Sequence, residues 1–210
     1  MTPPHWRARA VARCAALLLA LAWAATARAV TIEEADSAFR AGRYDAARIA
    51  YDEILKENPY SAHALYQRAI LHSWDNQLDT ALVLVRRARA LDPYDPDLAV
   101  AQARFLLWAG KYNESVALYD SVLTSDPERR DALLGRAQAL SWYGHYAQAD
   151  SGYRRVLARN PRDAGAWLGL ARIEHWQGDE YGARAPLQHA LALDPGLHGA
   201  RELQSAIDAA

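Results

Sequence analysis

The sequence predicts an all-α solenoid of five stacked helical hairpins, because three features return every 34 residues. The first is a proline that follows Asp or Asn, at Pro59, Pro93, Pro127, Pro161 and Pro195. The second is an alanine without exception, at Ala35, Ala69, Ala103, Ala137 and Ala171. The third is a residue suited to a left-handed turn, at Gly42, Asn76, Gly110, Gly144 and Gly178. A fixed period of this size, closed by proline, is typical of stacked units of two helices joined by a turn.

Two further columns describe the second helix of each unit. Small residues, which let two helices approach closely, fill one column: Ala47, Ala81, Ser115, Ala149 and Ala183. Large apolar residues fill the other and anchor the helix: Tyr51, Val85, Tyr119, Tyr153 and Leu187. The glycine column supplies the left-handed conformation that ends each first helix. Together the columns predict helices of about 14 residues separated by short turns.

These columns resemble the tetratricopeptide repeat (TPR) family over nearly the whole chain after its N-terminal leader. The resemblance implies a right-handed superhelix (solenoid) of five helix-turn-helix repeats, here numbered one to five, plus a C-terminal capping helix. Their expected bounds are about 30–61, 62–95, 96–129, 130–163 and 164–197, with the cap at 198–210. The family's usual aromatic residue at the fourth position of the first helix is present only as Trp167; Thr31, Leu65, Ala99 and Leu133 take the other places. Such repeats serve many roles, so the family implies an architecture and not a function.

The N-terminal leader, residues 1–29, has the features of a secretory signal peptide. It carries four arginines and no acidic residue, encloses an apolar run over 14–24, and ends in the small-x-small sequence Ala27-Arg28-Ala29. We therefore expect cleavage before Val30 and no membrane span in the mature chain, since the apolar run is too short to cross a bilayer. An uncleaved membrane anchor is the alternative.

Charge and cysteine content exclude some classes of partner and binding site. Removing the leader lowers the formal net charge from −1 to −5 for residues 30–210, so we expect no nucleic-acid partner, which would need clustered Lys and Arg. The only cysteine, Cys14, lies in the leader, so the mature chain has no disulfide and no cysteine-bound metal.

The ends of the array show specific helix signals. Thr31-Ile32-Glu33-Glu34 is a capping box, which predicts that the first helix begins there, with its partner over 44–57. Pro96 suits the first turn of a helix. In repeat five, Pro186 lies inside the second helix and predicts a kink or a late helix start. From residue 197 onward, a single apolar stripe predicts the capping helix: Ala200, Leu203 and Ile207.

One column is not required by the repeat itself: tryptophan at Trp74, Trp108, Trp142 and Trp176, with Arg40 in the equivalent place of repeat one. Each lies five residues after the invariant alanine, which is about 140° around the helix from its packed face. We therefore expect the four side chains on the inner side of the superhelix or at its edge. Because helices pack about 8–10 Å apart, the rings should be separate platforms and not one stack.

Side chains on the same inner face of the first helices are the candidate ligand groove. They are His63, Tyr66, Trp74, Arg104, Trp108, Gln138, Trp142, Arg172, His175 and Trp176. Since helix side chains lean toward the N-terminus, Trp108 should cover Arg104 and Trp176 should cover Arg172 in cation–π contacts. Three roles stay open for the tryptophans: packing between repeats, binding of a peptide or partner helix, and stacking against sugar rings.

No catalytic or metal-binding motif is present: the sequence contains no phosphate-binding loop, serine-hydrolase elbow or H-E-x-x-H. We expect a non-catalytic module without a cofactor, and a surface histidine at His175 in place of a zinc site. The main hypothesis is a periplasmic scaffold for protein partners. The alternative is a carbohydrate-handling module in envelope or exopolysaccharide assembly or export, because the tryptophan-before-glycine pattern resembles repeats of polysaccharide-export systems and repeats ahead of outer-membrane barrels. Association with the outer membrane fits either hypothesis.

Overall fold

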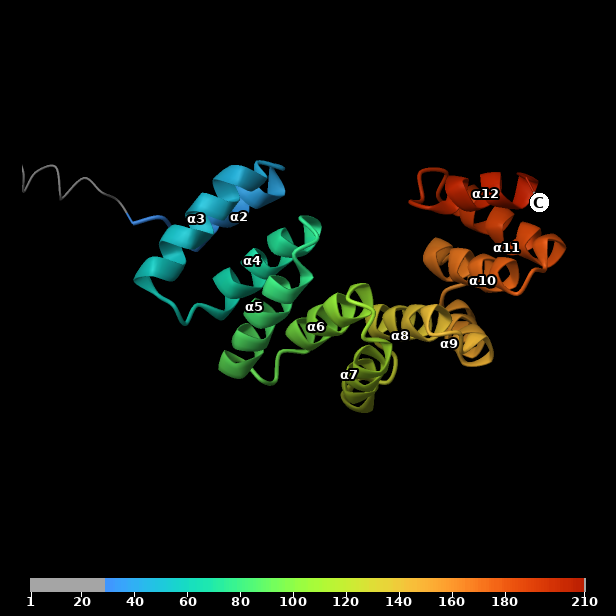
Figure 1. Ribbon diagram of the computed structural model, residues 1–210, viewed down its shortest axis with the longest axis horizontal. Helices are drawn as coiled ribbons and strands as arrows, with labels where there is room; N and C mark the ends of the chain where they lie inside the picture. The colour runs from blue at the N-terminus through green and yellow to red at the C-terminus, as the bar shows by residue number, and fades with distance from the viewer. Residues whose placement is uncertain (1–28, 210) are drawn as a thin grey trace, which may run out of the picture. The chain divides into compact units, whose positions relative to one another are not determined.

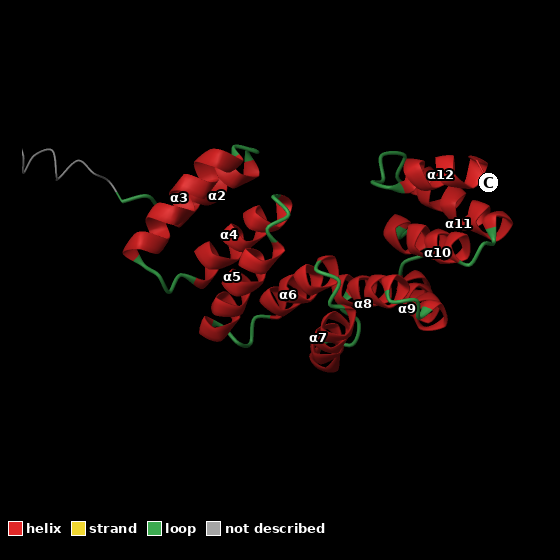
Figure 2. Ribbon diagram, in the orientation of Figure 1, coloured by secondary structure: helices red, strands yellow, loops and turns green. Residues whose placement is uncertain are grey.

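The structure, a computed structural model, describes residues 29–209, and every regular element in this range is an α-helix. The predicted all-α fold is confirmed (Figures 1 and 2). The predicted signal peptide lies outside the described residues, apart from Ala29. The chain divides into two compact units, the N-terminal unit up to Pro59 and the C-terminal unit from Tyr60 onward.

The N-terminal unit contains one helical hairpin, α2 (Ile32–Arg40) and α3 (Tyr44–Glu57). The predicted capping box is formed: the Glu34 amide donates to the Thr31 hydroxyl at 3.2 Å, and the Thr31 amide donates to the Glu34 carboxylate at 3.1 Å. The Tyr51 hydroxyl donates to Asp36 Oδ1 at 2.5 Å, which ties α3 to α2. The hairpin is therefore capped and cross-linked within itself.

The C-terminal unit continues the pattern with hairpins of nearly constant length. Its helices are α4 (Ala62–Trp74), α5 (Leu78–Leu91), α6 (Pro96–Trp108), α7 (Tyr112–Ser125), α8 (Arg130–Trp142), α9 (Tyr146–Arg159), α10 (Ala164–Trp176), α11 (Glu180–Leu193) and α12 (Ala200–Ala209). Successive helices pack against each other, and the first helices α6, α8 and α10 also touch in sequence.

Local signals set the helix ends as predicted. The residue two places after each tryptophan has a left-handed backbone, with φ of 59° at Asn76 and between 72° and 88° at Gly110, Gly144 and Gly178. Pro96 is the first residue of α6. Asp163 caps α10, accepting from the Ala166 amide at 3.0 Å.

In the C-terminal unit, the core lies between the two helices of each hairpin and between neighbouring hairpins. Both small columns are at most 1% exposed, and the Ser115 hydroxyl donates to the Ala103 carbonyl at 2.7 Å. Tyr119 and Tyr153 each need a glycine in the next repeat: a Cβ at Gly135 would lie 2.3 Å from Tyr119 Cζ, and one at Gly169 would lie 2.3 Å from Tyr153 Cζ. In both cases the tyrosine ring occupies the space of the missing side chain.

Of the two outcomes predicted for Pro186, the late helix start is wrong, and the kink stays a prediction. Helix α11 begins at Glu180, in register with the other second helices, and continues through Pro186 to Leu193, so the late start is not found. The missing amide costs a hydrogen bond to the carbonyl of Gly182. Burial of Ala183 and Leu187 on either side of the proline holds the helix in place despite this loss.

The capping helix α12 covers the last hairpin. Its predicted stripe, Ala200, Leu203 and Ile207, is buried in one core cluster with Ala183 and Leu187 of α11. Within residues 29–209, none of the helices has the length and apolar character needed to cross a membrane.

Candidate functional site

The four tryptophans occupy one place in the fold, the last residue of α4, α6, α8 and α10. Each helix ends there because the next residues turn into the left-handed position that precedes the second helix. The side chains remain between 38% and 51% exposed. We call this row of tryptophans the tryptophan edge. About half of each ring is therefore used for packing, and the other half faces solvent.

Trp108 has the partner that the spacing predicts. The Arg104 guanidinium carbon lies 5.8 Å from the centre of the Trp108 ring, which confirms the predicted cation–π contact. The Trp108 ring also packs on Phe105, with centroids 5.9 Å apart. Burial raises the pKa of the nearby Tyr66 hydroxyl, and the positive charge of Arg104 opposes part of that shift. Tyr66, Arg104 and Trp108 thus form one cluster.

Trp176 does not have the predicted arginine partner. Its ring packs on Tyr146 instead, with centroids 6.4 Å apart and planes tilted by 34°. Arg172 extends toward the loop before α12, where its Nη2 would lie 2.3 Å from a Cβ at Gly199. Gly199 has no side chain, which leaves space there for the guanidinium, and the predicted Arg172–Trp176 contact is wrong.

Trp142 and Trp176 line a shared depression with two tyrosines, which we call the aromatic hollow. It has a volume of about 370 Å³ and is lined by Tyr112, Ser141, Trp142, Tyr146 and Trp176. The tyrosines are the first residues of α7 and α9, and the tryptophans are the last residues of α8 and α10. The Ser141 hydroxyl donates to the Ala137 carbonyl at 2.8 Å. The hollow therefore offers aromatic faces and two phenol groups, with no charged residue in its lining.

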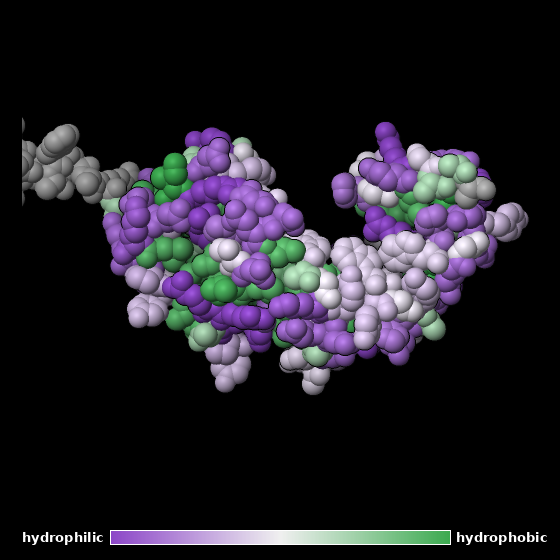
Figure 3. All heavy atoms as spheres, viewed as in Figure 1, coloured by the Kyte–Doolittle hydropathy of each residue, from purple (hydrophilic) through white to green (hydrophobic). Residues whose placement is uncertain are grey.

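The surface over α8 to α10 is neither strongly polar nor strongly apolar in the space-filling view (Figure 3). Pale tones, which mark the intermediate hydropathy of residues such as tryptophan and tyrosine, spread over that part of the C-terminal unit.

The remaining predicted groove residues differ in how far they are buried and in what they contact. His63, Gln138 and Arg172 are half-buried on the same helices. His175 Nδ1 lies 2.7 Å from Glu180 Oε2, so this histidine joins α10 to α11. Apolar residues on the same helices are buried in the core: Val100, Leu107 and Leu168.

Sequence reasoning missed Tyr112 and Tyr146. Their signal was available, because both lie in a 34-residue column at the start of the second helices: Tyr44, Leu78, Tyr112, Tyr146 and Glu180. The column is less uniform than the tryptophan column, and only the fold shows that Tyr146 and Trp176, from neighbouring repeats, meet. Among the described residues, no three His, Cys, Asp or Glu side chains are grouped in a way that could hold a metal ion.

Comparison with protein families gives a clear match. The sequence model of the family described as tetratricopeptide repeat matches residues 32–96, 100–140 and 144–198. None of the curated proteins compared with this chain matches it.

Solved structures with the same fold include three proteins of low sequence identity. The type IV pilus biogenesis factor PilW superposes with a TM-score of 0.75 at 22% identity, covering 84% of this chain and 82% of PilW. A MamA structure (AMB-1) gives 0.64 at 19%, covering 79% of this chain and 98% of MamA. YrrB, described as a TPR protein with an unusual peptide-binding site, gives 0.61 at 16%, covering 83% and 90%.

Proposed function

Because this chain belongs to the tetratricopeptide repeat family, we propose that it is a non-catalytic scaffold that binds a protein or peptide partner through its tryptophan edge. The observation that carries the proposal is the aromatic hollow, where Trp142 and Trp176 keep 38% and 41% of their surface exposed. Tryptophan and tyrosine dominate the binding energy of protein interfaces, because they bury large areas with few rotatable bonds.

Several properties of the edge suit a peptide. The four tryptophans lie in consecutive repeats, so an extended segment that crosses the repeats meets a ring in each. Arg104 beside Trp108 adds a cation that a partner's carboxylate or carbonyl can contact. The peptide-binding site named for YrrB supports this type of ligand for a related fold.

We propose further that the chain acts after export, in the periplasm. The support is the leader: four arginines, an apolar run and a small-x-small end. The type IV pilus role named for PilW is compatible with a cell-envelope setting. Cell fractionation tests this directly, since the full chain should appear shortened in the periplasm, and a chain that lacks residues 1–29 should remain inside the cell. Retention of the full-length protein in the cytoplasm would contradict export.

The binding proposal is tested with a selected peptide. Peptides are chosen from a displayed random library against the protein, and their affinity is measured by calorimetry. Trp142→Ala with Trp176→Ala should weaken binding by at least about tenfold, which is about 1.4 kcal/mol. Tyr181→Ala, which removes an aromatic ring that is 89% exposed and outside the hollow, is the matched control and should change nothing. Equal binding by the double variant would place the ligand elsewhere.

A neutral oligosaccharide is the second candidate ligand, because the aromatic hollow has ring faces and no charged lining residue. Sugar rings bind flat aromatic faces, and the lining of the hollow supplies four aromatic rings. Tryptophan fluorescence is measured against a panel of neutral and acidic oligosaccharides. Quenching that disappears in the double variant supports a glycan ligand, whereas no quenching across the panel removes this candidate.

A further inference from the structure

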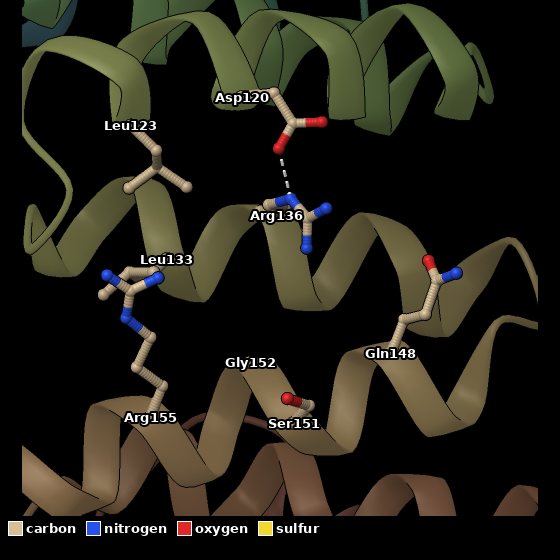
Figure 4. Close-up of a pocket in the computed structure, with 8 residues that line it drawn as sticks. All are labelled: Asp120, Leu123, Leu133, Arg136, Gln148, Ser151, Gly152 and Arg155. Carbon is tan, nitrogen blue, oxygen red and sulfur yellow. Dashed lines mark hydrogen bonds and ion pairs between the residues drawn. The ribbon is translucent and has the colours of Figure 1, made fainter.

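A second depression lies on a different side of α8, and we call it the α8 hollow. It has a volume of about 280 Å³ and is lined by Asp120, Leu123, Leu133, Arg136, Gln148, Ser151, Gly152 and Arg155. Helix α8 supplies its floor, and α7 and α9 supply its two walls (Figure 4). Nine residues separate Leu133 from Trp142, which at about 100° per residue puts them on opposite sides of α8. The α8 hollow is thus separate from the tryptophan edge and shares no residue with the aromatic hollow.

The next repeat shows what fills the same place. Thirty-four residues after Leu133 comes Trp167, and after Arg155 comes His189. The Trp167 ring lies 4.8 Å from the His189 ring, centroid to centroid, and its Nε1 donates to the Pro161 carbonyl at 2.8 Å. Repeat five therefore holds an indole that rests on a flat side chain and donates to the carbonyl of the proline turn.

Repeat three fills the place with other side chains. Leu118, the counterpart of Gly152, is partly buried against the core clusters on both of its sides. Arg89, the counterpart of Leu123, reaches across to Gln102 with a hydrogen bond of 2.8 Å. Repeat four has leucine where repeat five has tryptophan, and glycine where repeat three has leucine. The α8 hollow is open because repeat four lacks both the indole of repeat five and the leucine that repeat three has at the position of Gly152.

The charges around the α8 hollow favour a neutral ring. Arg136 Nε contacts Asp120 Oδ1 at 2.5 Å, and Arg155 Nη2 contacts Glu128 Oε1 at 2.8 Å, so each guanidinium already has a carboxylate. A further anion gains little from cations that are paired. The flat face of a guanidinium remains available, however, and its positive charge is complementary to the negative face of an aromatic ring.

We propose that the α8 hollow binds an aromatic side chain, above all a tryptophan, that a protein partner presents. The ring lies against Leu123 and Leu133 and stacks on Arg155, which takes the role of His189. Its N–H donates to the Pro127 carbonyl, the counterpart of the Pro161 carbonyl. Arg155 Nη2 now donates to that same oxygen at 2.8 Å, and a carbonyl oxygen can accept two hydrogen bonds. This site does not depend on the proposed function of the tryptophan edge.

The test uses N-acetyl-tryptophan amide as the probe and backbone amide shifts in NMR spectra as the readout. The probe should shift Leu133, Ser151 and Gly152 in a saturable way, and N-acetyl-leucine amide should shift them far less. Signals of Trp142 and Trp176 report the aromatic hollow separately, so binding at one hollow is not mistaken for binding at the other. Absence of saturable shifts at Gly152, or equal shifts with the leucine probe, overturns the proposal.

Two variants make the assignment specific. Leu133→Trp supplies the indole from within, as Trp167 does in repeat five, and should abolish the shifts at Gly152 while the protein stays folded. Arg155→Ala keeps the hollow open but removes the flat cation, and should weaken probe binding by about two- to fivefold. Unchanged binding in a folded Leu133→Trp protein contradicts the proposal.

The source of the ring is tested by sedimentation. A protein that remains monomeric at high concentration, with a wild-type hollow, supports a different protein as the partner. Self-association that Leu133→Trp abolishes would instead assign the hollow to a second copy of this chain, and would overturn the choice of partner.

Discussion

Neighbouring repeats in the C-terminal unit are joined in two different ways. Between repeats two and three, Val85 of α5 shares a core cluster with Ala101 of α6. Between repeats three and four, and again between four and five, the residue equivalent to Val85 is a tyrosine and the residue equivalent to Ala101 is a glycine. The combined volume of the two side chains is roughly constant, because the larger residue on one helix packs against the smaller residue sixteen positions later. Close-packed interiors need such compensation, because a single added carbon atom strains them.

The same division appears at the surface. The second helix of repeat two begins with Leu78, and those of repeats three and four begin with Tyr112 and Tyr146. The aromatic hollow lies along the tyrosine-bearing part of these three repeats, where Tyr146 meets Trp176. Repeats three and four thus have both a buried tyrosine and an exposed tyrosine on the second helix. The packing of the buried tyrosine on glycine holds the helices that carry the exposed rings in register.

The largest expected effect comes from placing tyrosine at the valine junction. Val85→Tyr should lower the free energy of unfolding by about 3 kcal/mol, because Ala101 leaves no space for the ring. Adding Ala101→Gly should recover at least about 1 kcal/mol despite the lower helix propensity of glycine. Urea denaturation of the three proteins measures both effects, and a Val85→Tyr protein as stable as the parent would show that residue size at this junction is unimportant.

Filling the space beside a buried tyrosine should lower the free energy of unfolding somewhat less. Gly169→Ala should destabilise the protein by about 2 kcal/mol, because the new Cβ would lie 2.3 Å from the Tyr153 ring. Gly165→Ala is the matched control in the same helix. Its Cβ would lie 3.4 Å from Asp163 Oδ1, an ordinary contact, and Gly165 is the second residue of α10, so the change should stabilise by up to about 0.5 kcal/mol. The opposite signs of the two changes, read from thermal unfolding, separate packing from helix propensity; equal signs would refute the tyrosine–glycine pairing.

Replacing the N-cap residue of a helix should lower the free energy of unfolding by a smaller amount, which differs between the junctions. Asp163 has no exposed side-chain surface, caps α10, and accepts a hydrogen bond from Arg130, the first residue of α8. Asp163→Ala should cost about 1–2 kcal/mol, whereas Asp95→Ala at the exposed cap of α6 should cost about 0.5–1 kcal/mol. Both values come from chemical denaturation, and a larger loss for Asp95→Ala would contradict the role assigned to Arg130.

The smallest expected effect is a dependence on pH at the junction of repeats three and four. Burial alone would raise the pKa of Asp131, but hydrogen bonds from Arg129 outweigh it and lower the pKa. A lowered pKa stabilises the folded state above the carboxyl's unfolded pKa, near 4, and this contribution is lost as the pH falls through the folded pKa. Because Asp131 is half exposed, the loss should be below about 1 kcal/mol. The unfolding midpoint is measured as a function of pH, and Asp131→Asn should make its fall at acid pH less steep. An unchanged fall would contradict this assignment.

Most of the architecture followed from the sequence alone. The helix ends, the left-handed turn residues, the buried alanine columns and the stripe of α12 depend on local signals or on a strict 34-residue period. Such signals are readable because each repeat contacts only its neighbours, so the same column meets the same environment in every repeat. The Arg104–Trp108 contact was also predictable, since both residues lie one turn apart on one helix.

Only the tertiary structure decided the details that depend on residues from two or three helices at once. The glycines at 135 and 169 give no sign of their purpose until the tyrosine rings are placed over them. Arg172 lies away from Trp176, where a distant glycine leaves space for it, and Tyr146 takes its place. The α8 hollow likewise depends on two helices, because it needs a residue smaller than tryptophan at Leu133 of α8 and no side chain at Gly152 of α9. A repeating pattern specifies which helix faces meet, whereas the shape of each cavity depends on the particular side chains that meet there.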